Sequence, residues 1–221
     1  MGNFSRKLKD MSPVLMEKNT GDPERIIYEV QRGNTVKNDL RYDLTFLYPE
    51  LLGQELPKTY GHYHKHLEIM EVIEGKVLWL IQKYEDNPKK IKEVYLIFAD
   101  KREKAIFPYN FGSISINPTK EKIVLSNWMS TETESHYEFH KQLHGMCYYI
   151  LKNEAGEILF EKNKNYDEVP ELIKLKPKEI PELGVTFDKP LIDYSEKELE
   201  FLNNPEKYKD ILTIEKCYHK I

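Results

Sequence analysis

The 221-residue chain contains little cysteine, no long apolar run and no large excess of charge of one sign. Its two cysteines, Cys147 and Cys217, are too few and too far apart for the disulfide framework of a small secreted domain. We therefore expect free thiols and a cytoplasmic protein. The best apolar candidate, Val77 to Ile81, is strand-sized and far below the ~18 apolar residues that cross a bilayer, so no membrane partner is expected.

The balance of charges argues against nucleic acid as a partner. The chain has 33 Lys and Arg against 37 Asp and Glu, a net charge of -4, and such a chain has no field that gathers a polyanion. No nucleic-acid partner is expected. Hydrophobic residues make up 40% of the chain, which is enough apolar surface for the core of one domain.

Most of the chain up to Ile158 consists of short β-favouring runs separated by turn-forming residues such as Pro49, Gly53 and Pro118. Runs of this length and spacing predict an all-β protein, built as an antiparallel sandwich or barrel. The predicted strands are Ile26–Gln31, Arg41–Tyr48, Ile69–Val72, Lys76–Tyr84, Val94–Ala99, Ile114–Ile116, Ile123–Trp128 and Met146–Lys152.

Beyond residue 160 the composition changes to a segment rich in Pro, Lys and Glu. We expect residues 1–160 to form a barrel with an N-terminal arm, and residues 161–221 to form an extension that packs on the barrel as an extended wrap. Within the extension, Ser195 precedes Glu198 by three residues and apolar residues follow. This pattern is a capping box, and it predicts a short helix.

Three of the seven histidines fall within five residues, in the segment His62-Tyr63-His64-Lys65-His66. Side chains alternate between faces along a strand, so His62 and His64 are expected to point the same way, about 7 Å apart. With Glu68 they form a set that suits a divalent Fe, Mn, Ni or Zn ion and leaves positions open for substrate. The alternative is an edge strand with solvated histidines, and the spacing of the two histidines favours the metal site.

This spacing resembles a known motif. One residue separates His62 from His64, three more precede Glu68, and six more precede Gly75. The order resembles the first motif of the cupin superfamily, whose members are double-sheet β-barrels of the jelly-roll type. The resemblance implies a cupin barrel, here with a short C-terminal extension that contains a helix.

Within the cupins, the chain resembles the phosphoglucose isomerases of the cupin type. Matches outside the metal motif include Tyr28-Glu29-Val30, Leu44 to Pro49, Thr59 before Gly61, and His136-Tyr137, and the resemblance covers about residues 5–160. It implies an aldose–ketose isomerase that interconverts glucose 6-phosphate and fructose 6-phosphate, the step shared by glycolysis and gluconeogenesis. It also implies a homodimer.

The resemblance further implies a role for individual residues. His62, His64 and Glu68 would hold the metal ion, and Glu68 is the carboxylate expected to act as catalytic base. The expected sugar-phosphate contacts are Tyr28, Thr45, Thr59, Gly61 and His136. Hydroxyl groups, a backbone N–H and a cationic imidazole can all donate hydrogen bonds to phosphate oxygens. The residues do not decide between proton transfer through an enediol and a hydride shift.

The chain departs from the cupin pattern at its second motif. Pro108 and Asn117 occupy the flanking positions, but Ser113 stands where the fourth ligand, a histidine, is expected. A hydroxyl stays protonated and binds a divalent ion weakly, so we expect weakened metal binding. Met70 also stands where a substrate-facing aromatic is expected.

Three interpretations of Ser113 stay open. A site with three protein ligands and water still works, a substitute histidine (His66, His140 or His144) completes it, or metal and catalysis are lost. The last case leaves a catalytically impaired cupin that binds a sugar phosphate. A cupin oxygenase with Fe(II) on the same two histidines and carboxylate is a weaker third function, and the matches at the sugar-phosphate positions argue against it.

Overall fold

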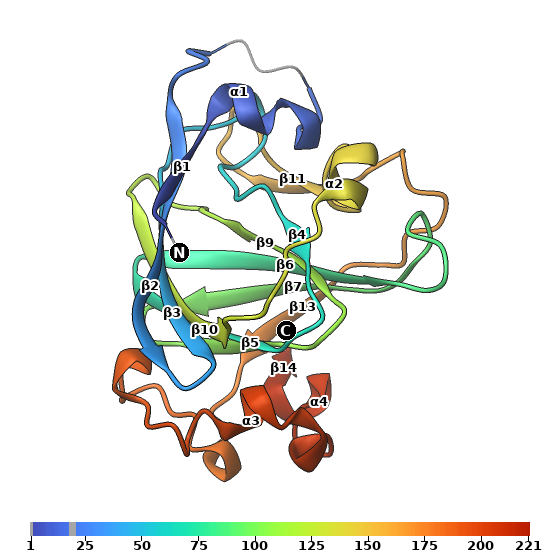
Figure 1. The fold of residues 1–221 in the computed structure, drawn as a ribbon. Helices are drawn as coiled ribbons and strands as arrows, with labels where there is room; N and C mark the ends of the chain where they lie inside the picture. The colour runs from blue at the N-terminus through green and yellow to red at the C-terminus, as the bar shows by residue number, and fades with distance from the viewer. Residues whose placement is uncertain (1, 18–20) are drawn as a thin grey trace.

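The computed structural model describes residues 2–17 and 21–221, and its strands form two six-stranded sheets around a shared core (Figure 1). The first sheet has the strand order β1-β2-β3-β10-β5-β8, and the second has the order β14-β13-β7-β6-β9-β4. β11 and β12 form a separate antiparallel hairpin. Neighbouring strands run antiparallel, except that β13 lies parallel to β7. The predicted all-β class and jelly-roll architecture are confirmed.

The strands are β1 Phe4–Lys7, β2 Ile26–Lys37, β3 Leu40–Leu47, β4 His62–Tyr63, β5 Glu68–Glu74, β6 Lys76–Tyr84, β7 Ile91–Asp100, β8 Lys104–Phe107, β9 Gly112–Ile116, β10 Ile123–Ser130, β11 Tyr148–Lys152, β12 Ile158–Lys162, β13 Ile173–Pro177 and β14 Tyr218–Lys220. The α-helices are α1 Leu8–Met11, α2 Glu138–Gln142, α3 Glu200–Asn203 and α4 Ile214–Cys217. Short 3-10 turns cover η1 Ser12–Val14, η2 Pro181–Leu183, η3 Leu191–Asp193 and η4 Pro205–Tyr208.

All of the predicted strands are present, and the strands that the sequence did not predict are short. β1, β4, β8, β12, β13 and β14 contain two to five residues each. Runs of this length show too little alternation to be recognised, and pairing with a longer neighbour stabilises them instead.

The two faces of β6 pack into two different hydrophobic clusters. Val77, Trp79 and Ile81 belong to the cluster between the two sheets. Leu78 and Leu80 point the other way, into a second cluster that also contains Tyr148 and Ile150 of β11. Both faces of β6 are therefore covered, which is why its sequence is a continuous apolar run rather than an alternating one.

Residues beyond 160 take part in this core. β13 adds a parallel strand to the second sheet, and Leu175, Leu191, Tyr194 and Phe201 are buried in the cluster between the sheets. The segment therefore contributes more than the surface wrap that its composition predicts. Its apolar residues are spaced irregularly between prolines and charged residues, so no helical or strand periodicity predicts that they are buried. The division of the chain at residue 160 stays a prediction.

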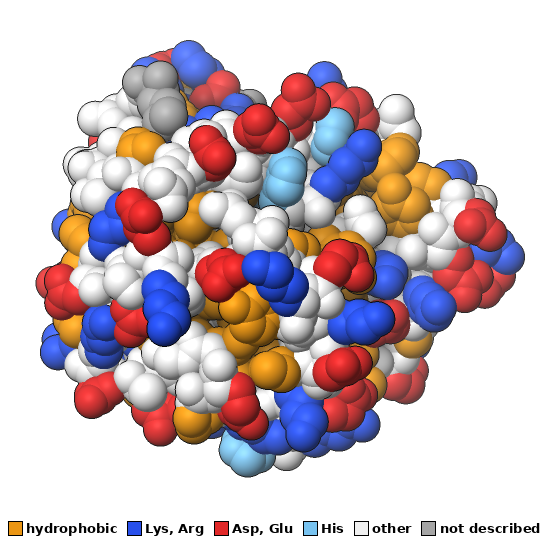
Figure 2. All heavy atoms as spheres, turned by 60° about the horizontal axis from the view of Figure 1, so that its bottom comes forward, with side chains coloured by type: hydrophobic (Ala, Val, Ile, Leu, Met, Phe, Trp, Pro, Cys, Tyr) orange, Lys and Arg blue, Asp and Glu red, His pale blue; other side chains and the backbone are white. Residues whose placement is uncertain are grey.

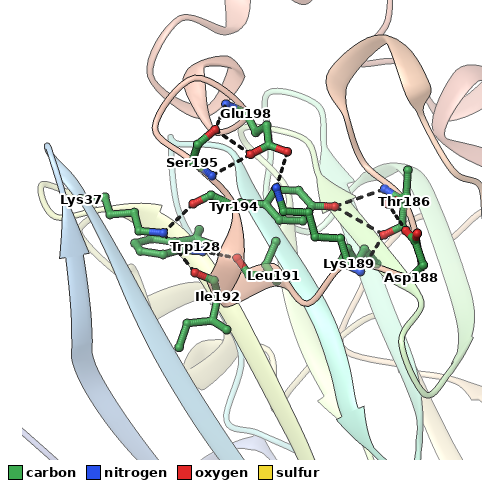
Figure 3. Close-up of polar contacts among 11 residues, drawn as sticks. Lys37, Trp128, Thr186, Asp188, Lys189, Leu191, Ile192, Tyr194, Ser195 and Glu198 are labelled. Atoms are coloured by element: carbon green, nitrogen blue, oxygen red, sulfur yellow. Dashed lines mark hydrogen bonds and ion pairs between the residues drawn. The ribbon is translucent and has the colours of Figure 1, made fainter.

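Polar contacts attach the extension to the first sheet (Figure 3). Nε1 of Trp128, on β10, donates a hydrogen bond to the carbonyl of Leu191 at 2.9 Å. Nζ of Lys37, at the end of β2, donates to the carbonyls of Ile192 and Tyr194 at 3.0 and 2.5 Å. Glu71 on β5 accepts a hydrogen bond from the Leu191 N–H at 2.8 Å. The extension thus contacts the same strands, β10 and β5, that line the cavity described below.

The predicted capping box is confirmed. The Ser195 N–H donates to Oε2 of Glu198 at 2.8 Å, and the Glu198 N–H donates back to Oγ of Ser195 at 3.3 Å. The α-helix itself begins slightly later, at Glu200, and Pro205 begins the separate turn η4.

The molecule's surface at the end that carries α3 and α4 mixes charges of both signs. Figure 2 turns this end toward the viewer, and lysines, arginines and carboxylates alternate there without a field of one sign. In the part of the chain that the structure describes, no helix has both the length and the apolar character needed to span a bilayer.

Candidate functional site

A cavity of about 90 Å³ lies inside the barrel, and both sheets contribute to its walls. The predicted site residues that line it are Tyr28, Thr45, Thr59, Gly61, His62 and Glu68, together with Ser113. They come from β2, β3, β4, β5, β9 and the segment before β4. The barrel therefore brings together side chains that are up to 85 positions apart in the sequence.

Strand alternation explains which side chains reach the cavity. Arg41, Asp43 and Thr45 are alternate residues of β3 and all line it, as do Glu68 and Met70 on β5. The residues between them point to the opposite face of the sheet, since successive side chains on a strand alternate. Glu71, the residue after Met70, also points to that opposite face and contacts the extension.

Gly61 occupies a position that only glycine suits. Its φ is +85°, and a Cβ placed there would lie 2.5 Å from Cγ2 of Ile114 and 3.0 Å from Cδ2 of His140. The left-handed backbone and the close neighbours both exclude a larger residue. This turn directs the next residue, His62, into the cavity.

His64 contacts Glu68, which lines the cavity, but His64 itself is not one of the lining residues. Nδ1 of His64 lies 2.6 Å from the carbonyl oxygen of His66, which can only accept, so Nδ1 carries the proton. In the neutral ring, Nε2 then presents a lone pair to Oε2 of Glu68 at 3.3 Å. Two acceptors facing each other repel unless a proton or a metal ion lies between them. Both side chains are buried, at 1% and 7% exposed, so water does not relieve this repulsion.

His62 lies beside this pair, with its ring centroid 5.3 Å from that of His64. Burial lowers the pKa of His62 well below its usual range, and the neighbouring His64 and His140 lower it further. The ring is therefore neutral at pH 7 and able to donate a lone pair. Across the β4–β9 ladder His62 is paired with Ser113, so the serine stands next to the imidazole.

The donor types fit a divalent ion, but the described ranges 2–17 and 21–221 contain no group of three or more His, Cys, Asp or Glu side chains close enough together to hold one. His64 and Glu68 converge, and His62 is adjacent without completing the group. None of the three possible substitutes for the fourth ligand lines the cavity. Nδ1 of His66 contacts Oγ1 of Thr133, Nε2 of His140 contacts Sδ of Met146, and His144 is exposed.

Comparison with known proteins identifies the family. The model of the glucose-6-phosphate isomerase (GPI) family matches residues 5–171. The chain belongs to this family. The match confirms the resemblance to the cupin-type phosphoglucose isomerases. It ends just before β13, so β13 and everything after it lie outside the part of the chain that the family describes.

Two of the solved structures that the chain matches are distant from it in sequence. Oxalate oxidase in complex with glycolate is 18% identical with a TM-score of 0.42, and the match covers 61% of this chain and 62% of that one. AerE from Microcystis aeruginosa is 12% identical with a TM-score of 0.35, and the match covers 57% of this chain and 50% of that one. The chain thus spans about half the length of AerE. No curated protein matches the chain.

The structure places His136 differently from the other expected contacts. Its backbone pairs with Tyr63, with the His136 N–H donating to the Tyr63 carbonyl at 2.9 Å, but its imidazole is exposed and does not line the cavity. The neighbours Ser135 and Tyr137 line it instead. In the extended backbone around this bridge, alternation turns residues 135 and 137 inward and residue 136 outward.

The sequence did not predict several polar residues of the cavity. Arg32, Arg41, Asp43 and Asn127 line it, and each lies on a strand that also carries other lining residues. On β3 the sequence did contain an indication of this, because Arg41 and Asp43 alternate with the predicted contact Thr45 and therefore share its face of the strand. It was missed because an Arg and an Asp on a strand are ordinarily solvated.

Proposed function

We propose that the protein interconverts glucose 6-phosphate and fructose 6-phosphate in this cavity with the help of a divalent metal ion, Fe, Mn, Ni or Zn. The observation that carries the proposal is that Nε2 of His64 and Oε2 of Glu68 face each other at 3.3 Å, beside a cavity whose wall holds Glu68 and His62. His62, His64 and Glu68 would hold the ion. When bound, it would polarise the two sugar oxygens that exchange the carbonyl.

The charges of the cavity support the need for a cation. Two guanidinium groups, Arg32 and Arg41, and two carboxylates, Asp43 and Glu68, line it, so their formal charges cancel. A sugar phosphate brings up to two negative charges into this space. A divalent ion held by His62, His64 and Glu68 would offset them.

Hydroxyl groups along the wall are free to donate to the substrate. Oγ1 of Thr59 already accepts a hydrogen bond from the Ser115 N–H at 3.0 Å, so its own proton points elsewhere. The Tyr28 hydroxyl likewise accepts from the Tyr60 N–H at 3.4 Å, and burial raises its pKa, so it stays protonated. Together with Thr45 these donors suit phosphate and sugar oxygens.

Glu68 is the proposed base. Its carboxylate would take the proton from C2 of glucose 6-phosphate and return it to C1, while a proton moves from the oxygen on C2 to the oxygen on C1. The products are a CH2OH group at C1 and a carbonyl at C2, so atoms and charge balance.

The cavity has to widen when substrate enters. Its volume of about 90 Å³ is below the ~300–1,000 Å³ that is typical of ligand pockets. Met70 and Met129 line the wall, and their unbranched, flexible side chains can move to make room. This gives a use for Met70 at a position where an aromatic was expected.

The decisive experiment supplies chelator-stripped protein with each metal ion separately and measures glucose 6-phosphate formation from fructose 6-phosphate. We expect turnover to return with at least one ion. E68Q should abolish turnover while the protein still binds the sugar phosphate, and E74Q, an exposed position on the same strand, should keep the wild-type rate. A near-normal rate for E68Q would refute the assignment of the base.

One observation favours a second candidate. Ser113 in place of an imidazole, and the absence of an assembled three-donor group among the described residues, fit a cupin that binds a sugar phosphate without turning it over. Sugar-phosphate binding by metal-supplied protein that shows no turnover with any ion would establish this alternative.

We also propose that the protein is a cytoplasmic homodimer. The free, buried thiols of Cys147 and Cys217 fit a reducing compartment, and β1, β8 and β14 leave sheet edges that a second copy can cover. Light scattering should give a mass of twice the 26.3-kDa chain, and a mass of one chain would contradict the dimer.

A further inference from the structure

A buried ion pair, Arg41 with Asp43, lines the cavity and has no role in the proposed chemistry so far. Nε of Arg41 lies 2.9 Å from Oδ2 of Asp43, and the two side chains are 7% and 5% exposed. Burying such a pair costs about as much as the attraction returns, so stability alone does not explain it. Charged pairs retained inside a cavity are candidates for binding or catalysis.

The hydrogen bonds of Arg41 leave one edge of its guanidinium poorly satisfied. Nε donates to Asp43, and Nη1 donates to the carbonyl of Ser130 at 3.1 Å. Among the residues that the structure describes, the one acceptor that Nη2 faces is the thioether Sδ of Met129 at 3.0 Å, which is a weak acceptor. Asp43 in turn accepts from the Gly33 N–H at 2.8 Å, so the carboxylate is fixed on both sides and holds the guanidinium plane.

Strand register places Arg41 at the level of Glu68. Met129 on β10 is paired with Arg41 on one side and with Glu68 on the other. Neighbouring strands lie ~4.8 Å apart, so the backbones of Arg41 and Glu68, two strands apart, are separated by about 10 Å. One small ligand between them can therefore contact both side chains. Thr45 lies four residues further along β3, toward the other end of the cavity.

We propose that Arg41, positioned by Asp43, binds the oxygen that becomes negatively charged during the isomerisation; this inference rests on the proposed function. When the proton leaves C2 for Glu68, the electron pair of the C2–H bond forms the C1–C2 double bond and the carbonyl electrons move to the oxygen on C1. A fixed guanidinium donor there stabilises the developing charge. Arg41 thus supplies a cationic hydrogen-bond donor to a site in which Ser113 replaces the expected histidine.

The test measures binding of two probes by calorimetry in the presence of chelator, so that no metal contributes. The first probe is a phosphorylated five-carbon aldonate, whose carboxylate carries its charge where the enediolate would. The second is hexitol 6-phosphate, which has the same phosphate and no second anionic group. We expect R41M to weaken aldonate binding about 10- to 100-fold, the range of one charge-assisted hydrogen bond, and hexitol phosphate binding less than about threefold.

Three further variants separate this role from a structural one. R32M removes the other guanidinium of the cavity and should leave the preference for the aldonate over the hexitol phosphate unchanged. D43N should lower the preference less than R41M does. R41K keeps the buried charge without the planar fork, should fold even if R41M does not, and should retain only part of the preference.

The outcomes distinguish this inference from the proposed function. Equal losses for both probes in R41M, or a wild-type preference in folded R41K, would overturn the role of Arg41 while the isomerase proposal stands. Wild-type protein that binds neither probe in chelator would overturn the role of Arg41, and the turnover assay with added metal ions would then decide the isomerase proposal on its own. A selective loss of aldonate binding would support the role even in protein that shows no turnover.

Discussion

The buried His140 should make the protein's stability depend on pH in a measurable way. Its side chain is fully buried, Nδ1 has no hydrogen-bond partner, and Nε2 contacts Sδ of Met146 at 2.7 Å. Burial lowers the pKa of His140 to about 3, and the charge of Lys58 adds to the shift. In the unfolded chain the same imidazole has a pKa of about 6.5.

The sign and size of the effect follow from these two values. Below pH 6.5 the unfolded chain binds a proton at His140 that the native protein does not, so stability falls as the pH falls toward 3. Above pH 6.5 the group contributes no pH dependence. Each pH unit well below 6.5 costs about 1.4 kcal/mol, so His140 should lower the free energy of unfolding by about 2 kcal/mol between pH 7.5 and pH 5.

Denaturant unfolding at several pH values, compared with H140F, tests this reasoning. Phenylalanine keeps the ring that packs 4.9 Å from Tyr63 and removes the titration. The stability difference between wild type and H140F should therefore change by about 2 kcal/mol over this interval, whatever its value at pH 7.5. H144N at the exposed neighbour is the control and should parallel the wild type. A constant difference between wild type and H140F from pH 7.5 to 5 would refute the argument.

Three other substitutions test the site and its support. S113H should raise the affinity for Zn(II) or Mn(II) by at least tenfold in calorimetry, because an imidazole beside His62 completes the donor set; unchanged affinity would show that residue 113 does not reach the ion. G61A should lower the free energy of unfolding by about 1–3 kcal/mol, since its φ is +85° and its Cβ would meet Ile114; a fully stable variant would contradict the observed turn. W128F should lower it by about 1 kcal/mol through loss of the hydrogen bond to Leu191, and wild-type melting would show that this contact does not stabilise the extension.

The sequence predicted those features that depend on local pattern. β6 and β10 are long apolar or alternating runs bounded by turn-formers, and each was predicted within a few residues of its ends. The site motif His62-x-His64 with Glu68 was recognised because its three proposed ligands lie within seven consecutive residues. Short strands such as β4 and β8 were missed, since they exist only through their pairing with β9 and β5.

The polar wall of the cavity could not be predicted in the same way, because it depends on register. Arg41 and Glu68 share a level of the sheet only through Met129, which pairs with both, and nothing in the chain near residue 41 indicates this. Alternation did indicate that Arg41, Asp43 and Thr45 share one face of β3. Once that face is known to be the inner one, a buried guanidinium held by a carboxylate becomes a candidate for ligand binding. Under the two proposals above, the fixed cation of Arg41 lies in the same row of the sheet as the proposed base Glu68, and this arrangement fits a rearranged catalytic site better than a degraded one.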